Sequence, residues 1–153
     1  MHTTRIAFSK VPEGIIKSMM ATEKYLATTG LEVQLLELVR LRASQMNGCS
    51  YCIDMHYKEA LAAGDAPLRL YSLSAWRETP YYNERERVAL ELTEALTNVS
   101  KDGVSDALYQ ALAKVFTQEE IANLTLAVAQ INSWNRLVAS FRYAPGQYTA
   151  GSQ

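Results

Sequence analysis

Two cysteines and one histidine stand close together in the sequence and are the residues best suited to chemistry. The stretch Asn47–Gly64, NGCSYCIDMHYKEALAAG, contains Cys49 and Cys52, the two cysteines of the chain, followed by His56. Because the spacings are three and four residues, all three side chains would lie on one face of a helix. The same face carries three apolar residues, Ile53, Ala60 and Ala63. We therefore predict that this face points inward.

This arrangement would activate a nucleophilic sulfur. A helix that begins at Cys49 lowers the pKa of thiols in its first turn, because unpaired backbone N–H groups favour the thiolate. His56, one turn after Cys52, can take the thiol proton. We predict that Cys52, nearer to His56, attacks, and that Cys49, earlier and nearer the rim, resolves it. Attack on a peroxide gives a sulfenic acid, which condenses with the neighbouring thiol to form a disulfide.

The same residues allow two other interpretations. A free cysteine is most often a small core hydrophobe, and a single histidine on an apolar face is most often a hydrogen-bonded core residue. A structural zinc site needs four ligands. Beside the cysteine pair and His56 the sequence offers His2 near the N-terminus, but no nearby carboxylate at ligand spacing. We therefore favour the dithiol interpretation and predict no metal site.

The elements that would position these residues are helices. Apolar residues recur at helical spacing, and no run alternates with the period of two that marks a strand. Asn83 with Glu86, and Thr117 with Glu120, have the spacing of capping boxes. Glycine or Asn-Gly pairs end several of the helical stretches. We expect helices over residues 12–30, 31–48, 49–64, 67–73, 83–99 and 117–143.

We therefore predict an all-α, single-domain bundle of roughly six to eight helices over residues 1–153. Its core would span about 12–143, and the polar tail APGQYTAGSQ would be loose. A thioredoxin-like fold is excluded, because a CxxC motif indicates that fold only beside a βαβ pattern.

Composition narrows the functional class. The net charge is −1, with no basic stripe for nucleic acid and no polybasic patch or apolar span for a membrane. The N-terminus, MHTTRIAFSKVPEG, lacks a signal-peptide core, so we expect a cytoplasmic protein. In that reducing compartment a cysteine pair is more suited to transient chemistry than to a structural bridge. No Gly-rich phosphate loop or HExxH motif indicates a nucleotide, flavin or metal cofactor.

The spacing of Glu37, Cys49, Cys52 and His56 reads E-x11-C-x2-C-x3-H, and it resembles the alkylhydroperoxidase D-like branch of the carboxymuconolactone decarboxylase family. The flanking segments RLRASQMNGCSYCIDMHYKEALAAG, WRETPYYNERERVALELTEALT and AQINSWNRLVASFR are similar to its peroxidase-related members. The resemblance implies an all-α fold, a thiol-dependent peroxidase or disulfide reductase, and a homo-oligomer, either a trimer or a hexamer. It also implies a hydroperoxide substrate and a dithiol reductant such as a lipoyl or thioredoxin-like protein.

The resemblance also assigns roles to four residues. Cys52 matches the peroxide-attacking cysteine, Cys49 its resolving partner, His56 the motif histidine and Glu37 the acid of a proton relay. The residue pattern alone would place Glu37 at the surface beside Arg40. The chain departs from the best-studied members, which carry a second histidine where Tyr51 stands. A phenol is a poor base near neutral pH, so the relay would be shorter or run through water.

Two other groups of residues have no assigned role in the sequence. A polar set, Gln130, Asn132, Asn135 and Arg136, interrupts an apolar helix, and we favour helix–helix or subunit contacts over pocket lining. That helix has more than one apolar face, which indicates an oligomer. An aromatic group, Trp76, Tyr81 and Tyr82, could cover a pocket or fill an interface.

The sequence thus predicts a thiol-based peroxidase that works through Cys52 and Cys49. One alternative is a lyase of the decarboxylase kind acting on a small lactone acid, although that branch generally lacks the cysteine pair. A second is a non-enzymatic redox sensor that uses the same dithiol as a switch.

Overall fold

The computed structural model describes residues 3–101 and 103–151, and within those ranges it contains helices and no strand. The all-α prediction is confirmed. The helices are α1 (Glu13–Leu26), α2 (Val33–Met46), α3 (Ser50–Ala62), α4 (Pro67–Ser72), α5 (Glu84–Thr97), α6 (Asp106–Val115) and α7 (Gln118–Phe141). Two short 3-10 helices, Phe8–Lys10 and Leu73–Glu78, complete the described elements.

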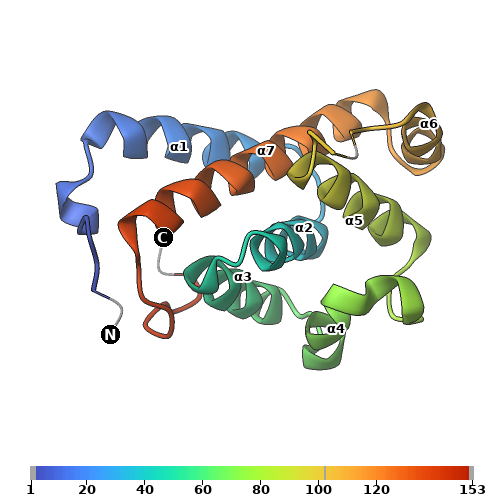
Figure 1. Cartoon of the computed structure of the whole chain (residues 1–153). Coiled ribbons are helices and arrows are strands. Elements are labelled where there is room, and N and C mark those ends of the chain that lie inside the picture. The colour runs from blue at the N-terminus through green and yellow to red at the C-terminus, as the bar shows by residue number, and fades with distance from the viewer. Residues whose placement is uncertain (1–2, 102, 152–153) are drawn as a thin grey trace.

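Helix α2 lies in the middle of the bundle (Figure 1). It contacts α3, α5 and α7, while α1 runs beside the long α7 on the outside. Because neighbours surround α2, its buried residues include a glutamate and a serine as well as leucines. Helix α7 contacts α1, α2, α3, α5 and α6 within the one chain. The several apolar faces of α7 are therefore covered by helices of the same chain. They do not require a second copy of the protein, and the oligomer remains a prediction.

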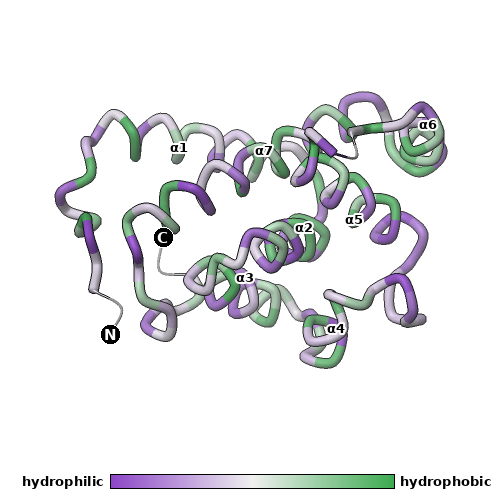
Figure 2. Tube along the Cα trace, in the orientation of Figure 1, coloured by the Kyte–Doolittle hydropathy of each residue, from purple (hydrophilic) through white to green (hydrophobic). Residues whose placement is uncertain are grey.

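Two apolar clusters form the core. One joins α2, α5, α6 and α7 and includes Val39, Leu92, Leu112 and Leu124. The other joins α2 to the segment between α3 and α5 and includes Leu38. Figure 2 shows the apolar stretches of α2, α5 and α6. Together these clusters hold α2 in place, and with it the residues that α2 presents to α3.

The aromatic segment before α5 belongs to the second cluster. Trp76 and Tyr82 are buried there, and the Trp76 indole donates to Glu94 Oε1 at 2.9 Å. Tyr81 remains partly exposed. The sequence left open whether these aromatic residues cover a pocket or fill an interface. In the structure Trp76 and Tyr82 pack inside the chain.

Both predicted capping boxes are confirmed. The Asn83 side chain accepts from Glu86 N at 2.9 Å, and Thr117 Oγ1 accepts from Glu120 N at 3.2 Å. Helix α6 was not named by the sequence analysis, although its signals are present. Ser105 caps it through Leu108 N at 3.2 Å, and buried leucines recur at helical spacing along it.

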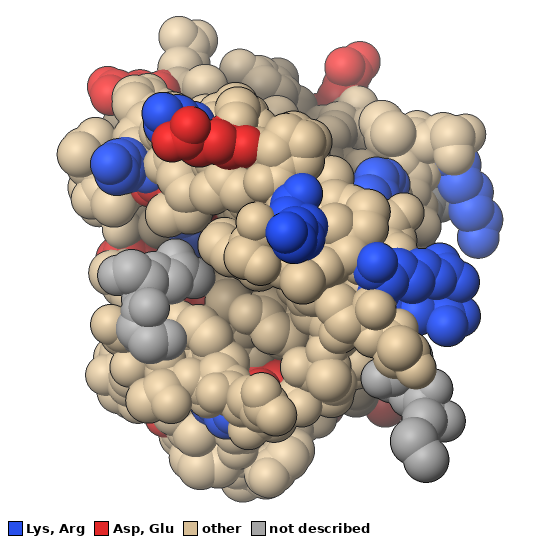
Figure 3. Space-filling model, turned by 90° about the vertical axis from the view of Figure 1, so that its left-hand side faces the viewer, with Lys and Arg blue, Asp and Glu red and all other residues tan. Residues whose placement is uncertain are grey.

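The C-terminal tail differs from its prediction. Instead of being loose, its described residues, 144–151, lie against α3, because α3 presents charged side chains that pair with their backbone. Gly146 N donates to Asp54 at 2.9 Å, Gly151 N donates to Glu59 at 2.9 Å, and Lys58 Nζ donates to the Tyr148 carbonyl at 2.9 Å. Both ends of the described chain lie on the same side of the molecule in Figure 1. Figure 3 views that side and shows a mainly uncharged face with scattered Lys and Arg, several of them at the right-hand edge.

Candidate functional site

The cysteine pair sits where α2 ends and α3 begins. Gly48 adopts the left-handed conformation, with φ of 64°, which ends α2 and turns the chain into α3. Cys49 is the N-cap of α3, and its sulfur accepts from Cys52 N at 3.4 Å. The two residues form a disulfide with a Cα–Cα distance of 5.3 Å. The prediction that the two thiols meet at a helix start is confirmed.

One turn further along α3, His56 is buried on the same face as Cys52. Its Nδ1 lies 2.8 Å from Glu37 Oε2 on α2. The exposed fractions of His56 and Glu37 are 6% and 4%. A histidine and a carboxylate shielded from water in this way interact more strongly than a surface pair.

The residue pattern alone had placed Glu37 at the surface, and that expectation is wrong. Its predicted partner is correct, since Arg40 Nη1 donates to Glu37 Oε1 at 2.7 Å. The error has a physical reason: α2 is covered on several sides, so the face that holds Glu37 and Ser44 is also buried. The resemblance moves Glu37 into the site as the acid of the relay, and in the structure Glu37 lies beside His56.

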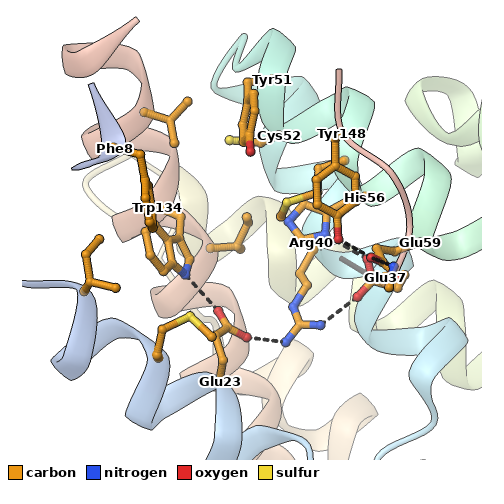
Figure 4. A pocket seen from close by; sticks show the side chains of 16 residues that line it. Phe8, Glu23, Glu37, Arg40, Tyr51, Cys52, His56, Glu59, Trp134 and Tyr148 are labelled. Atoms are coloured by element: carbon orange, nitrogen blue, oxygen red, sulfur yellow. Dashed lines mark hydrogen bonds and ion pairs between the residues drawn. The ribbon is translucent and has the colours of Figure 1, made fainter. Parts of the chain in front are cut away.

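Glu37 belongs to a longer chain of charged contacts. Arg40 Nη2 also donates to Glu23 Oε2 on α1 at 2.7 Å. Glu23 Oε1 in turn accepts from the Trp134 indole on α7 at 2.9 Å. Figure 4 shows this chain running from Trp134 through Glu23 and Arg40 to Glu37. Arg40 therefore fixes one oxygen of Glu37 while His56 occupies the other.

These contacts determine the charge of Glu37. Burial would raise the pKa of Glu37, but the hydrogen bond and charge of His56, together with Arg40, outweigh burial and leave that pKa below its ordinary value. Glu37 is thus a carboxylate near neutral pH and can accept a hydrogen bond from the Nδ1–H group of His56. The other ring nitrogen, Nε2, is buried and has no hydrogen-bond partner among the described residues. In a neutral ring with its proton on Nδ1, Nε2 carries the lone pair that can accept a proton.

Cys52, His56 and Glu37 line one cavity of about 740 Å³. Its other walls come from α1, α7, the N-terminal 3-10 helix and the C-terminal tail, which contributes Tyr148. Cys49 is not among the lining residues, and it is as buried as Cys52. The expectation that Cys49 lies nearer the rim finds no support, because Cys52 and not Cys49 lines the cavity. As the N-cap of α3, Cys49 packs in an apolar cluster with Cys52 and Val138.

Tyr51 stands where the second histidine of other members would be, and it also lines the cavity. Its ring meets Tyr143 edge-on, with centroids 5.6 Å apart. Burial, with a contribution from Asp54, raises the pKa of Tyr51 above its ordinary value. Tyr51 therefore stays protonated at neutral pH and can donate a hydrogen bond but not act as a base.

The amides of α7 serve helix contacts, as the sequence analysis favoured. Asn47 Nδ2 donates to Asn132 at 3.0 Å and to Asn135 at 2.9 Å, which ties the end of α2 to α7. Asn135 Nδ2 donates to Ser44 Oγ at 3.0 Å. Gln130 Nε2 donates to the Met19 carbonyl on α1 at 2.9 Å. These bonds hold α2, on which Glu37 and Arg40 stand, against α7.

Neither a metal cluster nor a membrane span is found in the described part of the chain. Residues 3–101 and 103–151 contain no group of three or more His, Cys, Asp or Glu side chains arranged to hold a metal ion. His2, considered as a ligand above, lies outside the described residues. No helix within these ranges combines the length and apolar character needed to cross a bilayer.

The carboxymuconolactone decarboxylase family model matches residues 15–95, which is more than half of the chain. The chain belongs to this family. It is 40% identical over 134 residues to the uncharacterized protein YdfG of Bacillus subtilis (strain 168), covering 87% of this chain and 90% of YdfG.

Two solved structures have the same fold as this chain. One is the crystal structure of ATU0492 from Agrobacterium tumefaciens, a protein of unknown function described as a candidate antioxidant defence protein AhpD. Its sequence is 38% identical to this chain, and the two structures superpose with a TM-score of 0.91 over 95% of this chain and 100% of ATU0492. The alkylhydroperoxidase AhpD core of an uncharacterized peroxidase-related protein from Ralstonia eutropha JMP134 is 20% identical, with a TM-score of 0.79 over 88% of this chain and 72% of that one. The chain therefore has an AhpD-like fold.

Several polar residues of the cavity were not expected from the sequence, among them Glu23, Arg40 and Trp134. Arg40 was noticed only as a surface partner of Glu37. Glu23 and Trp134 are 111 positions apart, and nothing in their spacing indicates that they meet. Their contact depends on α1 lying beside α7, which only the folded chain reveals.

Proposed function

We propose that the protein is a thiol-dependent peroxidase that reduces hydroperoxides through Cys52. The observation that carries this proposal is the position of Cys52. It is one half of a closed disulfide, and it lines the same cavity as the buried His56–Glu37 pair. A redox-active sulfur and a proton acceptor thus face one space that a substrate can enter.

In the reduced protein, His56 Nε2 takes the proton of the Cys52 thiol, directly or through water. The thiolate attacks the outer oxygen of the hydroperoxide, so that a sulfur–oxygen bond forms and the oxygen–oxygen bond breaks. The leaving alkoxide takes the proton from His56 and departs as an alcohol. Glu37 supports both steps, because its carboxylate stabilises the imidazolium that forms in between.

Cys49 then closes the cycle. Its sulfur attacks the Cys52 sulfenic acid, and the hydroxyl leaves as water with the thiol proton of Cys49. The product is the disulfide at the start of α3. An external dithiol restores both thiols by exchange and is itself oxidised to a disulfide. We further propose that this dithiol belongs to a lipoyl or thioredoxin-like protein. We also propose that the chain assembles into a trimer or hexamer.

Steady-state consumption of cumene hydroperoxide with dithiothreitol as reductant tests the proposal. We expect Cys52→Ser to lose turnover completely, because no sulfenic acid can form. Ser50→Ala, an exposed position in the same helical turn, should retain wild-type turnover. Equal consumption by wild type and Cys52→Ser would overturn the peroxidase assignment.

The resolving role needs a separate variant. Cys49→Ser should consume one equivalent of hydroperoxide and accumulate a Cys52 sulfenic acid, which dimedone traps and mass spectrometry detects. A sensor would form its disulfide but show no sustained turnover with excess dithiol. A lyase would keep its activity in the Cys49→Ser/Cys52→Ser double variant.

A further inference from the structure

We infer that the cavity selects uncharged, largely apolar ligands and rejects ligands that carry a carboxylate, with Glu23 as the residue that sets this selectivity. In naming a hydroperoxide as the reacting group we rely on the proposed function. The selectivity itself concerns binding, so it can be measured without any peroxide.

The size and walls of the cavity favour an organic ligand much larger than hydrogen peroxide. A volume of about 740 Å³ lies within the range that encloses small organic molecules. Apolar side chains from three helices form most of the wall: Ile16, Met20, Met55, Ile131, Trp134 and Val138. Each methylene buried against such a wall strengthens binding by about threefold to fourfold. A very small hydroperoxide would gain little from these contacts.

The polar end of the cavity carries an excess of negative charge. Three carboxylates line it, those of Glu23, Glu37 and Glu59, against a single guanidinium, that of Arg40. Arg40 is already engaged by two of them, at 2.7 Å each. A ligand carboxylate would therefore find this guanidinium already paired and would lie close to carboxylates of like charge.

Glu23 prevents Arg40 from pairing with an anionic ligand. It accepts from both Arg40 and the Trp134 indole, so it holds two donors that a ligand carboxylate would otherwise use. Its side chain is 20% exposed and that of Arg40 is 14% exposed, so both can be reached from the cavity. Unlike Glu37, Glu23 makes no contact with His56 in the structure. It can be changed without removing the partner of the proposed base.

The test compares two redox-inert ligands with the same skeleton. One is 2-phenyl-2-propanol, the alcohol that cumene hydroperoxide would yield, and the other is its para-carboxylate. Binding is followed by NMR through the indole N–H signals of the disulfide form. Trp134 reports on the cavity, and Trp76, which bonds Glu94 outside it, serves as the internal reference.

We expect the neutral alcohol to shift the Trp134 signal saturably, and the carboxylate to bind at least about tenfold more weakly. Glu23→Gln should reduce that ratio to about threefold or less. Glu91→Gln, an exposed position on α5 with the same change of charge, should leave the ratio unchanged.

Two results would overturn the inference: carboxylate binding as tight as that of the alcohol, or no shift of Trp134 by either ligand. If the ratio of alcohol affinity to carboxylate affinity stays the same in Glu23→Gln, Glu23 does not set the selectivity. If the alcohol binds as expected but Cys52→Ser still consumes peroxide, the peroxidase proposal fails while the selectivity stands.

Discussion

At the scale of single residues, Glu37 makes two contacts with different consequences for the site. The bond to His56 sets which imidazole nitrogen keeps its lone pair, and the bond to Arg40 keeps the carboxylate in place. Its pKa lies below the ordinary value of about 4.5, so the charged form stabilises the folded protein. That stabilisation is fully present above pH 4.5 and is lost as the pH falls through the lowered pKa.

Glu37→Gln should therefore be less stable than wild type by about 1–3 kcal/mol at pH 7, because a buried charge-assisted bond is weakened. The difference should shrink as the pH falls below the ordinary pKa of a glutamate. Urea unfolding at pH 7, 5 and 3.5 measures it, with Glu91→Gln as the exposed control. A difference that stays constant with pH would show that the charge of Glu37 is not involved.

Tyr51 gives a second prediction at this scale. Because its pKa is raised, it cannot serve as the base that a second histidine would provide. Tyr51→Phe keeps the edge contact with Tyr143 and should keep peroxidase turnover within about threefold of wild type from pH 6 to 9. His56→Gln should reduce turnover by roughly a hundredfold. A comparable loss in both variants would mean that the phenol takes part in proton transfer.

At the scale of elements, the junction between α2 and α3 positions the dithiol. Gly48, at this junction, has a left-handed backbone conformation. A Cβ added to it would meet no atom within 4 Å. The cost of a side chain there is therefore one of backbone conformation alone. Gly48→Ala should lower the free energy of unfolding by about 1–2 kcal/mol, and Gly48→Asn by less.

Gly14, in the first turn of α1, is the matched control because its Cβ would also meet open space, but its φ is not positive. Gly14→Ala should be neutral or stabilising by up to about 1 kcal/mol. Thermal unfolding of Gly48→Ala, Gly48→Asn and Gly14→Ala measures whether each change stabilises or destabilises the fold. Equal effects at Gly14 and Gly48 would contradict the role of the left-handed turn.

Much of the element layout could be predicted from the sequence, because its signals are local. Both capping boxes and the glycine stop at Gly48 lie within a few residues of the helix ends they mark. Helix 106–115 was passed over although Ser105 caps it. The burial of Glu37 could not be read from α2 itself, because it depends on how many neighbours cover that helix.

At the scale of the whole molecule, the cavity exists because segments distant in sequence meet. Helix α1 brings Glu23 to Trp134 on α7, and the tail brings Tyr148 over α3. The cysteine–histidine spacing could be predicted because it lies within one helix. The Glu23–Arg40–Trp134 contacts could not, since no periodicity links residues on three different helices.

The tail provides the prediction at this scale. Deleting residues 144–153 removes Tyr148 and Gly151 from the cavity wall but no residue of the two apolar core clusters. Helix content by circular dichroism should be unchanged, while binding of 2-phenyl-2-propanol should weaken by about threefold to tenfold. Tyr148→Phe, which keeps the ring and the backbone but loses the hydroxyl bond to Glu59, should show a smaller effect. Unchanged binding in the deletion variant would mean that the tail does not close the cavity.

The most direct test of the central claim is a thiol count on the reduced protein before and after one equivalent of cumene hydroperoxide. We expect two free thiols per chain at the start and none afterwards, with one equivalent of alcohol released and both thiols recovered with dithiothreitol. A count that stays at two after hydroperoxide is added would contradict it.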